Sequence, residues 1–144
     1  MRILIDADGC PVVDLTIKIA KENSRECIIL CDTSHVFAKD GAKTILVPKG
    51  ADSVDFALVN MLIAGDVVVT QDYGLAAMCL ARRAIPLSQD GMVYSDDNID
   101  ALLLHRHTAK RIRMAGGRLK GVAKRTKAQD KSFEESLRVI LSRT

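Results

Sequence analysis

Short apolar runs alternate along most of the chain with segments in which apolar residues recur every three or four positions. A short apolar run bounded by polar or turn-forming residues is typical of a strand buried on both faces, and the longer spacing is typical of an amphipathic helix. The predicted strands are residues 2–6, 27–31, 44–47, 67–70 and 84–88. The predicted helices between them are residues 12–23, 52–64 and 73–83.

This alternation predicts a three-layer α/β fold, in which helices cover both faces of a mostly parallel sheet. Ligands of such folds bind at the carboxyl ends of the strands. A chain of 144 residues fits one domain, which buries roughly 68 % of the surface that the unfolded chain exposes. We therefore expect a single domain over residues 1–144.

The chain after Gly91 is helical in pattern and rich in basic residues. A long helix is predicted from residue 96 or 97 to residue 114, where Gly116 ends it, and a basic loop follows. Ser132 and Glu135 have the spacing of a capping box and predict a last amphipathic helix. That helix is expected to pack on the domain through Phe133, Leu137, Ile140 and Leu141.

Charge divides the chain into two parts. Residues 1–104 hold 9 Lys/Arg and 15 Asp/Glu, a net charge of −6, whereas residues 105–144 hold 12 Lys/Arg and 3 Asp/Glu, a net charge of +9. Such asymmetry favours a polyanion-binding surface beside an acidic site over a merely solvated basic face. The expected partner is nucleic acid, RNA more than DNA, bound by a basic segment at about residues 105–131. Its candidate phosphate contacts are Arg106, Lys110, Arg111, Arg113, Arg118, Lys120, Lys124 and Arg125.

Aromatic residues are scarce beside this basic segment. Phe133 is the one aromatic residue near it, and the chain has no Trp. Proteins that read bases in single strands stack them on aromatic rings. The composition therefore favours recognition of the phosphate backbone with limited sequence preference.

Aspartates gather where the predicted strands end. Asp6 and Asp8 directly follow the first strand, Asp72 follows the fourth, and Asp52 and Asp55 occupy the first turn of the helix between the third and fourth strands. Carboxylates within a few ångströms repel one another, so either their pKa values rise or a cation is bound. Oxygen ligands suit Mg²⁺ or Mn²⁺, which support phosphodiester hydrolysis. All five are candidate metal ligands, and Asp6, Asp8, Asp55 and Asp72 are candidate catalytic residues.

Each of these aspartates also has an ordinary structural interpretation. Asp52 and Asp72 are candidate N-caps, and Asp8 is a candidate for an Asx turn before Gly9. Asp6 ends an apolar strand with no helix start at its own position, which favours a functional role. The remaining loop or surface candidates are Asp32, Asp40, Asp90 and Asp100, of which Asp90 is a lesser option for the site because it follows the fifth strand.

Four ordered blocks, spread over nearly the whole chain, resemble the signature blocks of the bacterial YaiI/YqxD family. They are Ile5-Asp-Ala-Asp-Gly-Cys-Pro-Val12, Gly50-Ala-Asp-Ser-Val-Asp-Phe56, Gly65-Asp-Val-Val-Val-Thr-Gln-Asp-Tyr-Gly-Leu75 and Gly116-Gly-Arg-Leu-Lys-Gly121. The resemblance implies membership of the PIN-like nuclease superfamily, and with it a PIN-like fold.

The resemblance also implies roles for the aspartates. Asp6 takes the place of the PIN aspartate that ends the first strand, Thr70-Gln71-Asp72 looks like the PIN Thr-x-Asp, and Asp55 fits the helix aspartate before it. Asp52 lies close enough to compete with Asp55. PIN nucleases usually carry another acidic residue on a helix after the first strand, and this chain has no clear counterpart. Asp8 is an extra acid that would compensate.

Two other functions fit the same residues. Asp6-Ala-Asp8-Gly9 resembles the haloacid-dehalogenase phosphatase motif, in which Asp6 would be the nucleophile, Asp8 the acid/base and Thr70 a phosphate contact. Against it, Cys10 and Pro11 stand where that motif continues with Thr or Val, and no lysine site is clear. The third function is a non-catalytic nucleic-acid-binding module. Replacing Asp6 should abolish either enzyme activity and leave binding by such a module intact.

The remaining features concern the cellular compartment. No apolar stretch approaches the roughly 20 residues of a membrane span, and the N-terminus lacks a signal-peptide pattern, so we expect a cytoplasmic protein with no membrane partner. The cysteines Cys10, Cys27, Cys31 and Cys79 form no CxxC pair and are interpreted as reduced core thiols.

Overall fold

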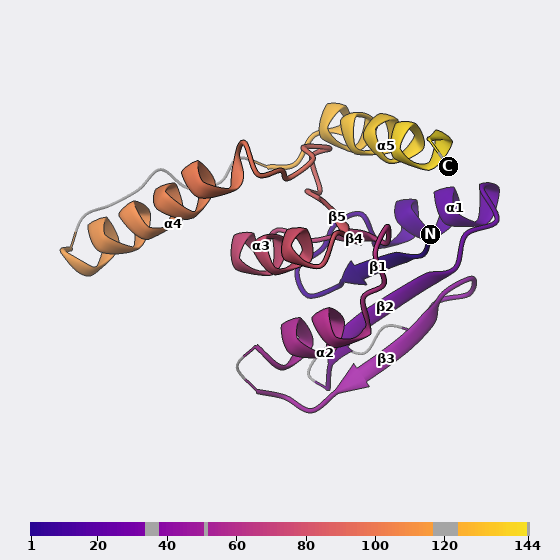
Figure 1. Ribbon diagram of the computed structural model, residues 1–144, viewed down its shortest axis with the longest axis horizontal. Helices are drawn as coiled ribbons and strands as arrows, with labels where there is room; N and C mark the ends of the chain where they lie inside the picture. The colour runs from indigo at the N-terminus through magenta and orange to yellow at the C-terminus, as the bar shows by residue number, and fades with distance from the viewer. Residues whose placement is uncertain (34–37, 51, 117–123, 144) are drawn as a thin grey trace.

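A parallel sheet of five strands forms the centre of the protein (Figure 1). The structure, a computed structural model, describes residues 1–33, 38–50, 52–116 and 124–143. Its strands are β1 (Ile3–Asp6), β2 (Cys27–Asp32), β3 (Lys43–Val47), β4 (Val67–Val69) and β5 (Ile85–Leu87). Their order across the sheet is β3-β2-β1-β4-β5, and every neighbouring pair is parallel. All five predicted strands are confirmed to within one residue at each end.

Helices cover both faces of this sheet. They are α1 (Val13–Glu22), α2 (Ser53–Met61), α3 (Tyr73–Ala81), α4 (Ile99–Met114) and α5 (Lys127–Ser142). Helices α1 and α5 lie on one face, and α2 and α3 lie on the other (Figure 1). The three-layer α/β fold predicted from the alternation of strands and helices is therefore confirmed.

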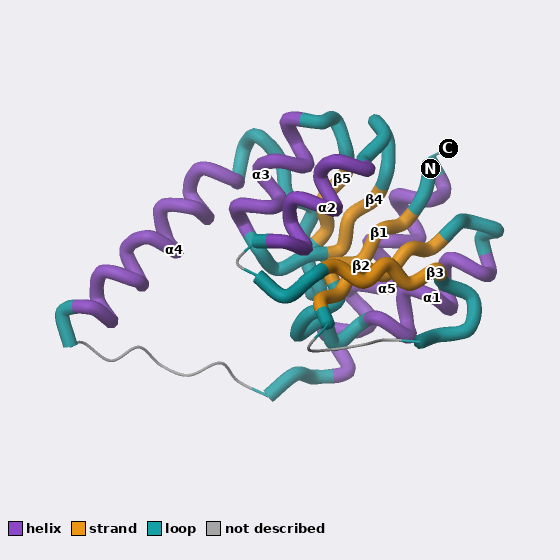
Figure 2. The backbone as a smooth tube through the Cα atoms, turned by 90° about the horizontal axis from the view of Figure 1, so that it is seen from below, coloured by secondary structure: helices purple, strands orange, loops and turns teal. Residues whose placement is uncertain are grey.

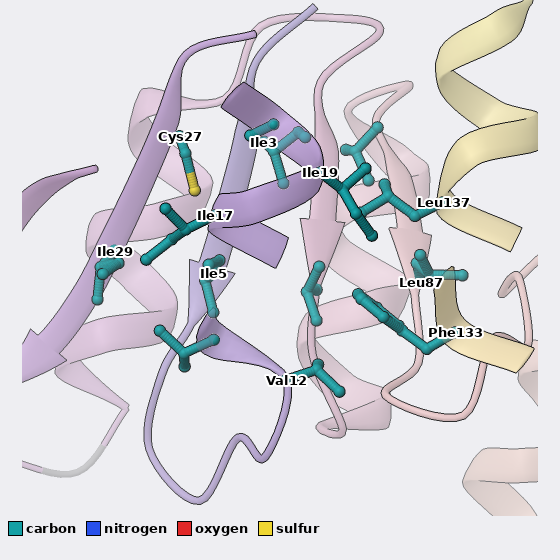
Figure 3. Close-up of a cluster of buried hydrophobic side chains, with 14 of the residues drawn as sticks. Ile3, Ile5, Val12, Ile17, Ile19, Cys27, Ile29, Leu87, Phe133 and Leu137 are labelled. Atoms are coloured by element: carbon teal, nitrogen blue, oxygen red, sulfur yellow. The ribbon is translucent and has the colours of Figure 1, made fainter. Parts of the chain in front are cut away.

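The central strand β1 explains why its sequence is apolar without interruption. Ile3 and Ile5 face α1 and α5 in the larger core cluster (Figure 3), whereas Leu4 faces α2 and α3 in the smaller one. All three side chains are fully buried. Burying a side chain of this size contributes about 1.5–3 kcal/mol. A strand covered on both faces has no solvent side on which a polar residue would be favourable.

Helix α5 begins earlier than its predicted capping box. The Thr126 hydroxyl accepts a hydrogen bond from the Gln129 backbone N–H, and the Thr126 N–H donates to Gln129 Oε1 at 2.7 Å. The prediction that Ser132 and Glu135 form the capping box is wrong, because the same spacing occurs earlier at Thr126 and the helix already spans Ser132. The predicted packing is confirmed: the buried side chains of α5 are Phe133, Leu137, Ile140 and Leu141. Figure 3 shows the first two.

Helix α4 leaves the body of the protein. Its first residue, Ile99, joins Ala76 and Tyr94 in a small buried cluster against α3. Further along, the helix extends away from the sheet (Figure 2), and both Leu104 and Met114 are largely exposed. Most of the basic residues predicted to contact phosphate on this helix therefore lie on a projecting arm.

The helices and the cysteines of the described residues bear on two further expectations. None of their helices has the length and apolar character that a membrane crossing requires. The four cysteines are free thiols, three of them buried, as predicted. Burial raises the pKa of Cys27 and of Cys79 to about 12, so both remain protonated at neutral pH.

Candidate functional site

A pocket of about 560 Å³ opens at the carboxyl end of the sheet. Its volume lies within the range of pockets that bind small molecules or cofactors. Its walls come from the segments that follow β1, β2 and β4, from the first turns of α2 and α3, and from Arg106 of α4. The aspartates that line it are Asp6, Asp8, Asp32, Asp52, Asp55 and Asp72. The fold thus brings all five predicted aspartates, and a sixth, around one cavity.

Thr70 connects the ends of the two neighbouring strands that carry Asp6 and Asp72. Its side-chain hydroxyl donates to Asp6 Oδ2 at 2.9 Å and accepts from the Asp72 N–H at 3.0 Å. The backbone carbonyl of Thr70 accepts a hydrogen bond from the buried Tyr94 hydroxyl at 3.1 Å. Because the one hydroxyl proton of Thr70 is directed at Asp6, the structure gives this residue a positioning role in place of the predicted phosphate contact.

Asp72 is both a helix cap and a pocket residue. Its Oδ1 accepts from the Leu75 N–H at 3.0 Å, which caps α3, and it accepts from Arg106 Nη1 at 3.4 Å. The predicted capping role of Asp72 is confirmed, and the same side chain lines the pocket. Gly74 leaves room for the contact between Asp72 and Arg106, because a Cβ at that position would lie 3.2 Å from Asp72 Oδ1 and 3.9 Å from Arg106 Nη1.

Asp52 occupies the N-cap position of α2 without capping it. Its side chain makes no capping hydrogen bond, and its backbone is left-handed with φ of 61°. A left-handed conformation is unfavourable for a residue other than glycine and often marks a functional site. The side chain lines the pocket, as do Ser53 and Tyr73, the first residues of α2 and α3. The positive ends of two helix dipoles therefore lie beside the aspartates and favour bound anions.

The aspartates raise one another's pKa values. Burial is the main cause of the raised pKa of Asp6, and the charges of Asp72 and Asp8 raise it further, although the hydrogen bond from Thr70 opposes them. Burial, followed by the charges of Asp72, Asp6 and Asp52, raises the pKa of Asp55 to about 6, against the opposing charge of Arg106. The protein thus holds negative charge here at a cost in free energy that bound protons or a cation would reduce.

The donor atoms of the pocket fit a magnesium-like ion better than a soft metal. Cys10 lines the pocket, but burial raises its pKa to about 11, so it offers a protonated thiol and leaves carboxylate oxygens as the charged donors. Within the described residues, no three His, Cys, Asp or Glu side chains converge closely enough to enclose an ion. Mg²⁺ keeps several of its waters and needs only one or two direct carboxylates. The arrangement therefore fits a hydrated divalent ion.

Asp32 and Gln89 line the pocket and were not predicted to belong to it. Asp32 ends β2 as Asp6 ends β1, so its place directly after an apolar run was the signal that could have identified it. Gln89 follows β5, and its Oε1 is buried with no hydrogen-bond partner among the described residues. Buried amide oxygens are rarely unpaired, and such atoms often mark functional sites. Nothing in the sequence distinguished Gln89 from other loop residues.

The predicted phosphate contacts divide by position. Arg106 reaches the pocket, where it is the one basic side chain among the described lining residues. Lys110, Arg111 and Lys124 are exposed and lie away from the lining. The side chain of Arg113, together with residues 118 and 120, lies outside the described part of the structure. The structure thus describes four exposed residues of the predicted basic surface. Arg106 lies at the pocket, and Lys110, Arg111 and Lys124 lie away from it.

Arg125 has a structural role that the sequence did not predict. Its guanidinium contacts Asp130 Oδ1 at 2.7 Å, Asp90 Oδ1 at 2.8 Å and the backbone carbonyl of Gln89 at 2.6 Å. Its side chain is only 19 % exposed. Because three acceptors of the protein hold this guanidinium, Arg125 fastens the chain before α5 to the turn after β5 in place of the predicted phosphate contact. Asp90 is part of the same anchor and does not line the pocket.

Comparison with known proteins identifies the family. Residues 4–143 match the family described as "Uncharacterized BCR, YaiI/YqxD family". The chain belongs to the YaiI/YqxD family. A UPF0178 protein of Exiguobacterium sibiricum is 53 % identical over 142 residues, which cover 99 % of this chain and 97 % of that relative. A UPF0178 protein of Ruminiclostridium cellulolyticum is 49 % identical over 142 residues, covering 98 % and 92 %. No solved structure matches this YaiI/YqxD protein.

Proposed function

We propose that this YaiI/YqxD protein is a divalent-metal-dependent nuclease that hydrolyses phosphodiester bonds in RNA or DNA. The observation that carries the proposal is the pocket of six aspartates, with the raised pKa values of Asp6 and Asp55, at the carboxyl end of a parallel sheet. The resemblance of Thr70-Gln71-Asp72 to the Thr-x-Asp of PIN-like nucleases agrees with it.

A bound Mg²⁺ or Mn²⁺ would neutralise the carboxylates and polarise a phosphate oxygen for attack by water. Asp6 and Asp72, which Thr70 joins, are the best-positioned residues to hold it. In this proposal Asp8, Asp55, Asp52 and Asp32 would contact waters of the ion. Thr70 keeps Asp6 in one orientation, because its hydroxyl donates to that carboxylate. The raised pKa of Asp55 also suits proton transfer near neutral pH.

Arg106 and the projecting helix α4 would attract the substrate. A pocket of carboxylates repels phosphate, so a polyanion needs positive charge beside it. Arg106 supplies that charge at the pocket, and Lys110 and Arg111 continue it along the exposed arm. We expect the strand to lie along α4 with one phosphate entering the pocket.

The phosphatase alternative has less support. Among the described residues, no lysine lines the pocket, and its one basic side chain is Arg106. Six carboxylates would also repel a small phosphate dianion that lacks other contacts. A non-catalytic binding module remains the main alternative, and the test below separates it from the nuclease.

The test is cleavage of end-labelled single-stranded RNA and DNA with Mn²⁺, Mg²⁺ or EDTA. Wild type is compared with Asp6→Asn and Asp72→Asn, and Asp40→Asn is the matched control because Asp40 is exposed and does not line the pocket. We expect cleavage that requires metal, is lost in the first two variants and persists in the control. Cleavage that survives both substitutions or persists in EDTA would contradict the proposal.

Binding is measured beside cleavage by fluorescence anisotropy at two salt concentrations. If about six phosphates are contacted, affinity should fall about 10³-fold between about 50 and 200 mM salt. Salt-sensitive binding without cleavage under any metal would identify a binding module. The absence of both would direct attention to small phosphate esters.

A further inference from the structure

Phe56 is an exposed aromatic residue beside the acidic pocket. Its side chain is 60 % exposed, whereas Phe133 and Tyr94 are buried and Tyr73 packs edge to face against Tyr94 with ring centroids 6.0 Å apart. Among the described residues Phe56 is therefore the most exposed aromatic ring, whereas Tyr73 is half-buried and lines the pocket. An isolated exposed Phe is common on protein surfaces, so its position relative to the pocket decides whether it has a role.

That position is the first turn of α2, whose start forms one wall of the pocket. Asp52, Ser53, Val54 and Asp55 all line the cavity, and the Phe56 N–H donates to the Asp52 carbonyl at 3.0 Å. Side chains on a helix lean toward its N-terminus and cover the preceding turn. We therefore expect the Phe56 ring to lean toward Asp52 and Ser53 at the rim of the pocket, since Phe56 itself is not among the residues that line the cavity.

We propose that Phe56 stacks on a base of a single-stranded nucleic acid whose phosphate lies at the aspartates. The proposal rests on the nuclease function proposed above and adds that the substrate is a strand with unstacked bases. A ring at the rim and carboxylates in the cavity match the two parts of a nucleotide, an aromatic base and an anionic phosphate that requires a cation. Stacking is tolerant of sequence because every base has an aromatic face. Duplex substrates would not use Phe56, since their bases are already stacked.

This proposal adds base stacking to the recognition of the phosphate backbone that the composition favours. The expectation considered Phe133, which lies near the basic segment in the sequence but is fully buried in the core. Phe56 lies far from the basic segment in the sequence, and the fold places its helix at the pocket that Arg106 also lines. The relevant aromatic residue thus comes from the acidic part of the chain.

The test uses a single-stranded oligothymidylate of about eight nucleotides, a length typical of single-strand binding sites. Its linkages are phosphorothioates, so the strand resists cleavage, and affinity is measured in Mn²⁺ at low salt. A second strand has the same backbone with abasic sites. The variants are Phe56→Ala, Phe56→Trp and Ile63→Ala, because Ile63 follows α2, is 61 % exposed and does not line the pocket.

We expect Phe56→Ala to bind the intact strand about tenfold more weakly than wild type. Its affinity for the abasic strand should equal that of wild type, and Ile63→Ala should change neither affinity. Phe56→Trp should restore binding, and because the chain has no Trp, the introduced indole is the sole Trp reporter. Its fluorescence should be quenched by the intact strand and unaffected by the abasic one.

Two results would overturn the proposal while leaving the nuclease function in place. In the first, Phe56→Ala binds the intact strand as tightly as wild type does. In the second, Phe56→Ala loses the same amount of affinity for the intact strand and for the abasic strand. If wild type binds neither strand at low salt and cleaves no nucleic acid, the nuclease function and the stacking role both fail. Circular dichroism of each variant checks that the exposed substitutions leave the fold unchanged.

Discussion

Asp66 and Asp6 lie at opposite ends of the sheet and have opposite electrostatic surroundings. At the amino end, Asp66 is buried against the Arg2 guanidinium at 2.6 Å and accepts from the Arg2 and Ile63 N–H groups. These contacts lower the pKa of Asp66 despite its burial. At the carboxyl end, Asp6 has Thr70 as a hydrogen-bond donor but faces Asp72 and Asp8, and its pKa is raised.

The difference separates a structural aspartate from one available for chemistry. Asp66 is fully satisfied within the protein and connects the start of β4 to β1. Asp6 is held in place but not neutralised, which is the state expected of a group that acts on a ligand. Removing the charge of Asp66 should therefore destabilise the fold, whereas removing the charge of Asp6 should not.

Asp66→Asn should lower the free energy of unfolding by about 3 kcal/mol, because the largely buried Arg2 guanidinium would lose its charge partner. Urea denaturation measures this value. Asp6→Asn is the matched control, since it removes a repelled charge and retains an acceptor for Thr70. We expect it to leave stability unchanged or raise it. Equal destabilisation by both substitutions would remove the contrast between the two ends of the sheet.

Mn²⁺ at about a hundred times its dissociation constant should stabilise the wild-type protein by about 2.7 kcal/mol. The physical reason is that an ion bound in the folded pocket, as proposed, would relieve repulsion among its aspartates. The expected measurement is an upward shift in thermal unfolding, which Asp66→Asn should retain and Asp6→Asn should lose. A shift of the same size in Asp6→Asn would place the ion elsewhere.

The pH dependence of stability should also differ between Asp55, at the carboxyl end of the sheet, and Asp66, at the amino end. Asp55, whose folded pKa is raised to about 6, stabilises the fold below its unfolded pKa, and this contribution is lost as pH rises through about 6. Asp55→Asn should therefore be more stable than wild type by about 1 kcal/mol at pH 8, after allowance for solvent screening, and the gain should vanish near pH 4. Unfolding in urea across this pH range tests it.

Asp66 has the opposite sign because its folded pKa is lowered. Its contribution is present above the unfolded pKa and is lost as pH falls through the folded value, so the instability of Asp66→Asn should shrink in acid. A gain for Asp55→Asn that persists near pH 4 would contradict the raised pKa.

Arg106→Gln should have the smallest effect on stability, within about 0.5 kcal/mol, because its pair with Asp72 is exposed. It should nevertheless raise the pKa of Asp55 further, since Arg106 lowers that pKa. Carboxyl-carbon NMR titration measures the change. Arg111→Gln is the control, because Arg111 is exposed on α4 and does not line the pocket. An unchanged Asp55 titration in Arg106→Gln would show that the arginine does not act on the site.

Most of the fold and part of the candidate site could be predicted from the local sequence pattern. The strands were predictable to within one residue because a strand buried on both faces must be apolar throughout. Asp6 and Asp72 were predictable as neighbours because the carboxyl ends of parallel strands meet at one edge. Asp32 satisfies the same rule, yet the sequence-based prediction for it was a loop or surface residue.

Other features depended on partners distant in sequence. Arg125 looks like any other residue of the basic segment, and only the fold brings Asp90 beside it at 2.8 Å. The capping box of α5 was misplaced because two segments have the same spacing, and the helix begins at the earlier one, where Thr126 and Gln129 form the box. Phe56 looks like a core residue in the apolar pattern of α2 and is instead exposed.

The sequence by itself determined the α/β class, the strand positions and the residues able to carry negative charge at strand ends, since these depend on burial and spacing along the chain. Only the tertiary structure decided which charges are neutralised. Whether an aspartate is paired like Asp66 or repelled like Asp6 depends on groups within a few ångströms of it. The fold brings Arg2 to Asp66, and Thr70 and Asp72 to Asp6, from positions 64 to 66 residues away. Electrostatic free energy follows distance in space, which the order of residues does not specify.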